Sequence, residues 1–211
     1  MKKIETIIAE HLLQIKAIKL EPAKPFLWAS GWNSPIYCDN RLILSYPVTR
    51  KLVINSFVGL IKENYPDVTL IAGVATGAIA YGAIIADKLD LPFAYVRPAP
   101  KTHGLSNMVE GRIQKEDRVV VIEDLVSTGN SSLSAVKALR SVGCEVLGML
   151  AIFTYNFDIA SENFWKNDCK LETLTNYNTL IKVAGEKGIV GSDQLKTLGE
   201  WRKNPAGWQI K

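Results

Sequence analysis

The middle of the chain alternates between short apolar runs and longer amphipathic stretches. The apolar runs, each of strand length, are residues 69–73, 93–96, 118–123 and 145–153. Residues 77–89 and 131–142 lie between such runs and place their apolar side chains at helical spacing. Strands that alternate with helices form parallel sheets, and their residues are apolar throughout because helices cover both faces. The alternation therefore predicts an α/β fold with a central, mostly parallel sheet flanked by helices.

The segments on either side of this region have other patterns. Residues 3–19 and 46–64 have helical spacing, whereas residues 20–40 are interrupted by prolines and contain one short predicted strand at 34–39. The C-terminal part is again helical in pattern, apart from the short piece 171–174. We therefore expect the C-terminal part to be an appendage on the core.

The composition is that of an ordinary globular protein. Of the 211 residues, 47% are hydrophobic, which is enough for a substantial core, and the net charge of +4 is not clustered, so we expect no nucleic-acid partner. No apolar run is long enough for a membrane span, and we expect no membrane contact. The odd set of cysteines, Cys38, Cys144 and Cys169, favours reduced thiols and a cytoplasmic location.

The strongest functional signal is at residues 119–132, where an apolar run ends in two acids. Glu123 and Asp124 stand at the carboxyl end of a predicted strand, the edge at which parallel sheets bind ligands. The loop that follows leads into a helix, whose free N–H groups and positive end favour a phosphate. The side-chain donors there are Ser127, Thr128, Asn130, Ser131 and Ser132. A ligand with both a phosphate and hydroxyls would fit; an ordinary capped loop is the alternative.

Residues 119–132 resemble the phosphoribosyl pyrophosphate signature of the type I phosphoribosyltransferases. The resemblance implies that family's fold, as one domain over 1–211. Its parts would be a core at about 45–155, a small hood built from terminal segments, here about 20–44, and a helical appendage at about 158–211. It also implies that Glu123 and Asp124 contact the ribose hydroxyls and that the loop binds the 5-phosphate. The loop residues are Leu125, Val126, Ser127, Thr128, Gly129, Asn130 and Ser131.

Two further segments resemble the orotate branch of that family. Residues 26–41 are similar to its Ser-Gly-x-x-Ser-Pro-x-Tyr-x-Asp segment, and residues 97–111 are similar to its mobile catalytic loop. The resemblance implies transfer of a 5-phosphoribosyl group from phosphoribosyl pyrophosphate to orotate, giving orotidine 5'-monophosphate and pyrophosphate in UMP biosynthesis. It places Ser127, Ile36 and Tyr37 at the orotate.

The same resemblance implies a pyrophosphate site with basic side chains. Arg97, Lys101 and His103 lie within seven residues of one another, and Thr76 and Gly77 match the family's pyrophosphate turn. Departure of pyrophosphate builds negative charge on the leaving group, which cations aimed at that place would stabilise. These three basic residues, together with the aspartate of the signature, are the expected catalytic residues.

The resemblance also implies a cofactor and a partner. We expect Mg²⁺, held mainly by substrate and water rather than by dedicated protein ligands. The family is dimeric, so we expect a homodimer in which Arg97, Lys101 and His103 act in the neighbouring subunit's site.

Several positions depart from the family pattern. Ala29, Pro98 and Gly77 stand where some members carry a lysine, and residues 153–156 lack an arginine that contacts orotate in others. The chain therefore has fewer basic contacts than some relatives. We expect Arg41 or backbone amides to hold the orotate carboxylate.

Three alternatives remain at the level of sequence. A phosphoribosyltransferase for another base would share the signature but not the 26–41 segment. A non-catalytic, nucleotide-sensing regulator would keep the site and add a basic nucleic-acid-binding region. A doubly wound dinucleotide-binding domain would carry a glycine fingerprint that this chain lacks.

Overall fold

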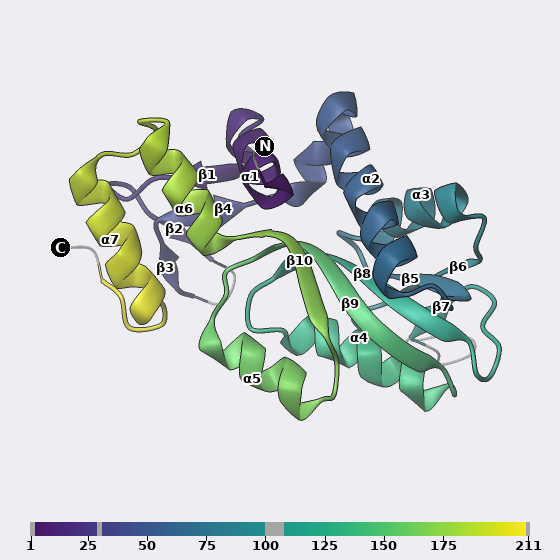
Figure 1. Ribbon diagram of the computed structural model, residues 1–211. Coiled ribbons are helices and arrows are strands. Elements are labelled where there is room, and N and C mark those ends of the chain that lie inside the picture. The colour runs from purple at the N-terminus through teal and green to yellow at the C-terminus, as the bar shows by residue number, and fades with distance from the viewer. Residues whose placement is uncertain (1–2, 29–30, 100–107, 210–211) are drawn as a thin grey trace.

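A twisted, mostly parallel sheet runs through the middle of the molecule (Figure 1). The computed structural model describes residues 3–28, 31–99 and 108–209, and within them six strands form the sheet in the order β10-β9-β8-β5-β6-β7. Only β7 is antiparallel to its neighbour among these strands. The strands are β5 (Leu70–Val74), β6 (Phe93–Val96), β7 (Val109–Glu110), β8 (Arg118–Val126), β9 (Glu145–Thr154) and β10 (Leu171–Asn176). The predicted α/β fold with a central, mostly parallel sheet is confirmed.

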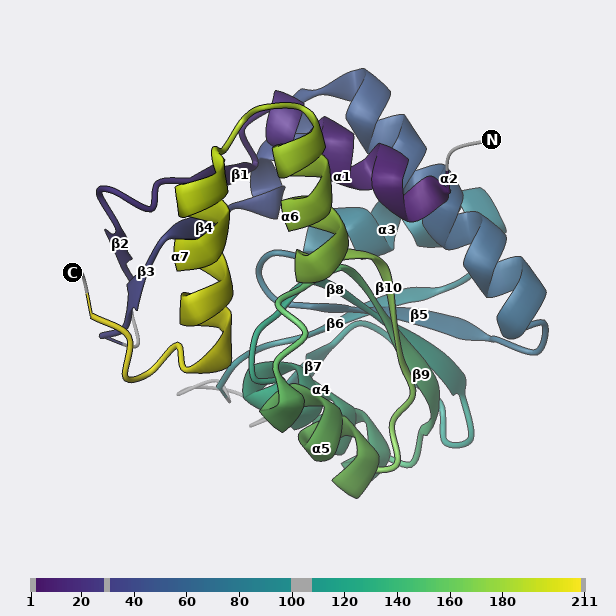
Figure 2. The ribbon, with the colours of Figure 1, turned by 60° about the vertical axis from the view of Figure 1, so that its left-hand side comes forward.

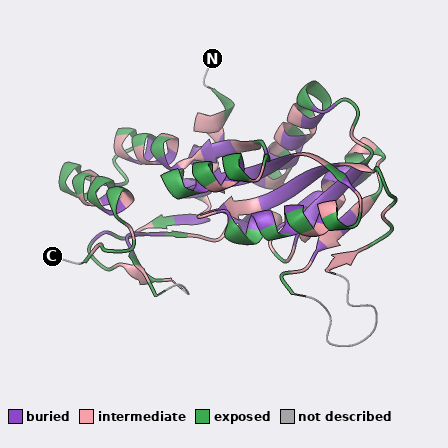
Figure 3. Cartoon of the chain, turned by 90° about the horizontal axis from the view of Figure 1, so that it is seen from below, coloured by how far each residue is buried: buried purple, intermediate pink, exposed green. Residues whose placement is uncertain are grey.

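Helices cover both faces of the sheet, which explains why its strands are continuously apolar. In Figure 1, α4 and α5 lie on one face, and α1, α2 and α3 lie on the other. These helices are α1 (Ile4–Gln14), α2 (Pro47–Asn64), α3 (Ile79–Leu89), α4 (Asn130–Ser141) and α5 (Asp158–Lys166). On β8, Val120 and Ile122 join the core under α1–α3, while Val119 and Val121 join the core over α4 and α5. The sheet is accordingly buried and the outer faces of the helices are exposed (Figure 3).

Three elements differ from the sequence-based expectation. The first helix ends at Gln14 rather than near residue 19, because Lys16 is left-handed at φ 57° and the chain turns into β1 (Ile18–Leu20). The strand of the signature continues beyond its acids to Val126. The short piece near residue 171 is β10, which extends the sheet beside β9. The C-terminal part is therefore not only helical, because it contributes an edge strand to the core sheet.

The two terminal parts of the chain meet beyond one end of the sheet. The first part forms two short antiparallel pairs, β1 with β4 (Ile36–Cys38) and β2 (Phe26–Leu27) with β3 (Asn33–Ser34), followed by the 3-10 helix η1 (Asn40–Ser45). The C-terminal part adds α6 (Tyr177–Glu186) and α7 (Ser192–Lys203), and α7 lies beside the β2–β3 pair (Figure 2). No helix among the described residues is long and apolar enough to cross a membrane.

An aromatic cluster around Trp201 joins these terminal parts to the sheet. Trp201 on α7 is fully buried, and its ring lies 5.6–5.9 Å, centroid to centroid, from four other rings. These rings belong to Trp28, Tyr155, Phe157 and Tyr177. The indole Nε1 of Trp201 also donates to the carbonyl of Asn33, at 3.1 Å. One side chain thus links the C-terminal helix, the N-terminal strands and the end of β9.

Replacing Trp201 by alanine should therefore destabilise the protein strongly. We expect a loss of about 3–5 kcal/mol in the free energy of unfolding, because a large buried ring leaves a cavity. Urea unfolding of the two proteins measures the loss. Trp165→Ala is the control, since Trp165 is 82% exposed on α5 and its removal should cost less than about 0.5 kcal/mol. Equal effects of the two substitutions would contradict the role given to Trp201.

Candidate functional site

A polar pocket of about 310 Å³ opens where β5 and β8 end. It is the edge at which a parallel sheet binds ligands. The residues that line it come from the segment after β4, the turn after β5, the end of β8 and the start of α4. They are Cys38, Asp39, Arg41, Val74, Ala75, Thr76, Gly77, Glu123, Asp124, Leu125 and Ser131. We call it the acidic pocket, because three of these side chains are carboxylates.

The two adjacent acids of β8 differ in their surroundings. Glu123 is buried, and its carboxylate accepts hydrogen bonds from the Ser132 hydroxyl at 2.8 Å and from the Asp124 N–H at 3.0 Å. Asp124 is only partly buried. Ser132 was predicted to be a phosphate donor, but it is buried with its hydroxyl on Glu123. The sequence could not reveal this, because the contact depends on how α4 sits against β8.

Burial governs the protonation of both acids. It raises the pKa of Glu123 well above the ordinary value, and the negative charge of Asp124 raises it further. Burial also raises the pKa of Asp124, although less, because hydrogen bonds and the positive charge of Arg41 act in the opposite direction. A raised pKa means that the site favours a proton, or another cation, close to these carboxyls.

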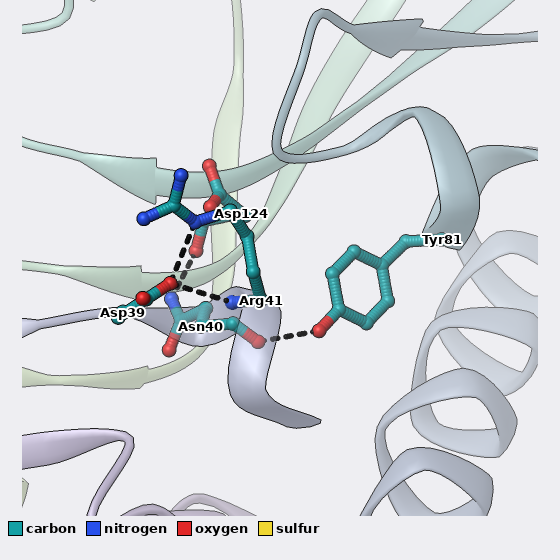
Figure 4. Close-up of polar contacts among 5 residues, drawn as sticks. All are labelled: Asp39, Asn40, Arg41, Tyr81 and Asp124. Carbon is teal, nitrogen blue, oxygen red and sulfur yellow. Dashed lines mark hydrogen bonds and ion pairs between the residues drawn. The ribbon is translucent and has the colours of Figure 1, made fainter. Parts of the chain in front are cut away.

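The position of Asp124 is fixed by close contacts from two other segments. A Cβ on Gly77 would lie 2.4 Å from Cγ of Asp124, so only glycine allows the turn after β5 to approach this carboxylate. On the other side, the Asn40 side-chain amide donates to the Asp124 carbonyl at 2.5 Å. Asn40 is itself held, since the Tyr81 hydroxyl of α3 donates to its carbonyl at 2.6 Å (Figure 4). The turn predicted as Thr76 and Gly77 thus lies against the predicted acids.

The loop between β8 and α4 is clamped by α5. Gly129 has φ 83°, in the left-handed region, and a Cβ there would lie 2.8 Å from the Phe164 ring. The Asn163 side-chain amide donates to the carbonyl of Thr128 at 3.0 Å. The free N–H groups at the start of α4 then follow directly after Gly129, as a phosphate site requires. Neither Asn163 nor Phe164 carries a sequence signal, since both act across the fold.

A second pocket of about 370 Å³ adjoins the acidic pocket. Cys38 and Leu125 line both, so the two pockets meet at these residues. The wall is largely aromatic, and we call it the aromatic pocket. Its lining residues are Leu27, Trp28, Tyr37, Cys38, Leu125, Ser127 and Tyr155.

The aromatic pocket contains two of the three residues predicted at the base. Tyr37 and Ser127 line it, whereas Ile36 is completely buried and is not among the lining residues. The Ile36 carbonyl instead accepts from the Trp28 indole at 3.1 Å and so helps to orient a wall residue. Trp28 and Tyr155 were not predicted, although Trp28 lies within the 26–41 segment and Tyr155 directly follows β9.

The predicted basic loop is seen only at its ends. β6 and β7 pair through Tyr95–Glu110 and Val96–Val109, which brings the two ends of the loop together. Arg97 follows β6, and its Nη1 lies 3.7 Å from Glu110 Oε1. Arg97 lines neither pocket among the described residues. Lys101 and His103 lie outside the described residues.

The chain is similar in sequence to known proteins. The model of the family described as "Phosphoribosyl transferase domain" matches residues 51–183. The chain is 56% identical over 202 residues to the orotate phosphoribosyltransferase of Cytophaga hutchinsonii, covering 96% of this chain and 97% of the relative. It is 53% identical over 210 residues to the orotate phosphoribosyltransferase of Porphyromonas gingivalis, covering 100% of each.

Solved structures show the same similarity. The orotate phosphoribosyltransferase from Aeropyrum pernix aligns with a TM-score of 0.76 and 28% identity, covering 87% of this chain and 99% of that chain. The UMP synthase of Leishmania donovani aligns with a TM-score of 0.77 and 27% identity over 93% of this chain, which matches 42% of that chain.

The raised pKa of Glu123 predicts a specific pH dependence of stability. Because the folded protein holds this proton more tightly than the unfolded chain, the contribution of Glu123 is fully present below its ordinary pKa of 4.5. It is lost as the pH rises through the raised pKa of the folded state. In Glu123→Gln, the amide oxygen can accept from the Asp124 N–H and the amide nitrogen can donate to the Ser132 hydroxyl oxygen, and the side chain does not titrate. The stability of this variant relative to wild type should therefore increase as the pH rises.

Urea unfolding at a series of pH values from about 4 to about 8 measures this difference. Glu145→Gln is the matched control, because Glu145 starts the neighbouring strand β9 and its side chain is largely exposed. A difference between Glu123→Gln and wild type that stays constant with pH, or decreases, would contradict the assignment.

Proposed function

Because the chain belongs to the phosphoribosyltransferase family, we propose that its two adjoining pockets carry out the orotate phosphoribosyltransferase reaction. The enzyme transfers the 5-phosphoribosyl group from phosphoribosyl pyrophosphate to orotate, and it gives orotidine 5'-monophosphate and pyrophosphate in UMP biosynthesis. Relatives named for this activity match the chain at 53–56% identity over nearly its whole length, which favours orotate over another base.

The observation that carries this proposal is the contact between the two pockets. An acidic pocket beside a phosphate-type loop suits a phosphorylated sugar, and an aromatic pocket suits a planar pyrimidine. Since the pockets meet at Cys38 and Leu125, the reacting carbon of the sugar and the ring nitrogen of the base can approach each other there. Burial and the charges of Asp39 and Asp124 raise the pKa of the Cys38 thiol, which keeps a neutral group at this junction.

Three segments of the chain bind the sugar phosphate in this proposal. Asp124 and Glu123, which both line the acidic pocket, contact the ribose hydroxyls, and the Glu123 carboxylate is held in place by the Ser132 hydroxyl and the Asp124 N–H. The loop from Ser127 to Ser131 holds the 5-phosphate through the N–H groups at the start of α4. The turn at Thr76 and Gly77, with its backbone close to Asp124, faces the diphosphate.

The base lies in the aromatic pocket. Tyr37 is 39% exposed and can cover one face of the ring, and Trp28 and Tyr155 supply apolar wall on other sides. Ser127 adds a hydroxyl at the boundary with the phosphate loop. Orotate's ring nitrogen is acidic enough to arrive deprotonated, so this arrangement requires no strong general base.

The chemical step develops positive charge on the ribose and negative charge on the departing pyrophosphate, and the site has groups that can stabilise each. As the bond to pyrophosphate breaks, the ribose becomes oxocarbenium-like, as in glycoside cleavage. The Asp124 carboxylate lies where it can stabilise that positive charge. Arg97, Lys101 and His103 neutralise the negative charge that develops on the diphosphate. Closing these groups over the substrate would also exclude water, which otherwise hydrolyses the activated sugar.

We propose Mg²⁺ as the cofactor. Among the described residues no group of three His, Cys, Asp or Glu side chains could hold a metal ion. The donor chemistry nevertheless fits an ion shared with substrate, because Asp124 offers carboxylate oxygens inside the acidic pocket and Mg²⁺ prefers oxygen ligands and retained water. When bound with substrate, the ion would supply positive charge to the diphosphate oxygens.

We also propose a homodimer and a cytoplasmic location. Arg97 directly follows β6, which lies next to the edge strand β7. Among the described residues, Arg97 lines neither pocket of its own chain, which supports an action in a neighbouring subunit's site. The three cysteines are free thiols, which supports a reducing compartment.

The activity is tested by following the absorbance of orotate in the presence of phosphoribosyl pyrophosphate. We expect orotate to be consumed with Mg²⁺ present and consumption to stop when a chelator removes the metal. Adenine, guanine, hypoxanthine and uracil serve as competing bases, and none should replace orotate. Preferred use of one of these bases would sink the orotate assignment, and full activity in the chelator would sink the role of Mg²⁺.

A mixing experiment tests the sharing of sites. Lys101→Ala and Asp124→Asn proteins, each inactive alone, are unfolded together and refolded as a mixture. If the loop acts in the neighbouring subunit, a mixed dimer contains one complete site, and about a quarter of all sites should be active in a random mixture. Mixed dimers are identified by a different affinity tag on each protein. Purified mixed dimers without activity would show that the loop acts within its own subunit.

A further inference from the structure

Arg41 occupies a position that the proposed roles leave unused. It belongs to the first turn of η1 and lines the acidic pocket together with Thr76, Gly77 and Asp124. Figure 4 shows its guanidinium beside the carboxylates of Asp39 and Asp124. Arg41 is absent from the aromatic pocket, so its placement does not support the expectation that it holds the orotate carboxylate.

Arg41 is a positively charged residue in a pocket whose other charged side chains are acidic. Three carboxylates, those of Asp39, Glu123 and Asp124, line the pocket. Among the described residues that line either pocket, Arg41 is the one cation. An anionic substrate that enters such a pocket is repelled unless positive charge is held close to it. Arg97 of the same chain lies beside Glu110 and lines neither pocket, and its proposed action is in a neighbouring subunit's site.

The guanidinium is oriented in advance by Asp39. Asp39 Oδ1 accepts from Arg41 Nε at 2.6 Å and from the Arg41 backbone N–H at 3.2 Å. This hydrogen bond holds the pKa of Asp39 below its ordinary value, so the pair stays ionised at neutral pH. Among the described residues, no hydrogen bond or ion pair is made by the two terminal nitrogens of Arg41, although the charge of Asp124 acts on its guanidinium, and its side chain is 60% exposed. Two parallel N–H donors on a planar group match the oxygens of a phosphate.

The backbone that carries Arg41 is also fixed. The preceding residue, Asn40, is buried and bridges the Asp124 carbonyl and the Tyr81 hydroxyl. The arginine is thereby tied to the strand that carries the ribose-binding acid and to the helix after the pyrophosphate turn. A side chain placed in this way can act on a ligand without first ordering a loop.

One anionic part of the substrate, the diphosphate, is placed in the same pocket as Arg41. The 5-phosphate has the loop from Ser127 to Ser131, and the base has the aromatic pocket. The diphosphate faces the turn at Thr76 and Gly77, which shares the acidic pocket with Arg41. We propose that Arg41 binds the diphosphate of phosphoribosyl pyrophosphate through its terminal nitrogens, while Asp39 holds its Nε. This inference rests on the proposed function and adds a residue to its diphosphate site.

Calorimetric titration with inorganic pyrophosphate in magnesium buffer tests the contact directly. Arg41→Ala should weaken pyrophosphate binding on the order of tenfold to a hundredfold, as for the loss of one charge-assisted contact. Arg41→Lys keeps the charge but not the planar fork, and should recover part of the affinity. Lys51→Ala is the matched control, because Lys51 is exposed on α2 and lines neither pocket. This substitution also removes one positive charge, as Arg41→Ala does.

A second titration, with ribose 5-phosphate, separates contact from an indirect effect through Asp124. If Arg41 touches the diphosphate, the affinity for ribose 5-phosphate should change by less than about twofold. In steady-state assays, kcat/KM for phosphoribosyl pyrophosphate should fall in Arg41→Ala while the KM for orotate changes little. Thermal unfolding of each variant confirms that the fold is retained.

The proposal is overturned if Arg41→Ala binds pyrophosphate as tightly as wild type, if it loses affinity equally for both ligands, or if wild type does not bind pyrophosphate. Failure of the proposed function gives a different result. In that case wild type would not consume orotate in the parallel assay, while the pyrophosphate titration would still decide the role of Arg41.

Discussion

The site depends on two adjacent acids near the end of β8, of which Glu123 is buried and Asp124 is partly buried. Burial of an acid costs free energy unless partners meet it, and the Glu123 carboxylate is met by the Ser132 hydroxyl and the Asp124 N–H. Three separate elements contact the two acidic residues. Ser132 on α4 donates to Glu123, Asn40 donates to the carbonyl of Asp124, and the turn after β5 approaches Asp124 closely enough to require Gly77. The acids therefore organise the phosphate loop, the pyrophosphate turn and the segment after β4 around a single point. Their raised pKa values are the remaining cost of that arrangement.

Residues at the end of β8 contribute to both pockets. At the end of β8, Asp124 belongs to the acidic pocket, Ser127 to the aromatic one, and Leu125 between them to both. A sugar phosphate and a planar base can thus be recognised by different chemistry only a few residues apart. Cys38 likewise lines both pockets. The reaction requires such an arrangement, because its bond forms between a charged sugar and a flat, apolar-faced ring.

The sequence predicts those parts of the molecule that depend on local pattern. The alternation from residue 69 onward predicts the sheet and its helices, and the 119–132 segment predicts the acids and the loop after them. What it misses depends on long-range contacts. Ser132 could be a phosphate donor by its sequence position, yet it is turned toward Glu123 by the seating of α4. β10 runs over the six residues Leu171–Asn176, lies in a segment that is otherwise helical in pattern, and is recognised as a strand through its pairing with β9. Trp28, Tyr155 and Asn163 become functional candidates only when distant segments meet.

The walls of the aromatic pocket come from both terminal parts of the chain, and this has a consequence for specificity. Trp28 lies in the N-terminal strands and Tyr155 follows β9, and both rings contact Trp201 of α7. Tyr155 also stacks on Phe157 at 5.5 Å, which extends the cluster toward α5. The wall that we propose for the base is therefore packed against a helix near the end of the chain. The acidic pocket takes Asp39 and Arg41 from the N-terminal part and its other acids from β8, but the two rings that pack on Trp201 line only the aromatic pocket.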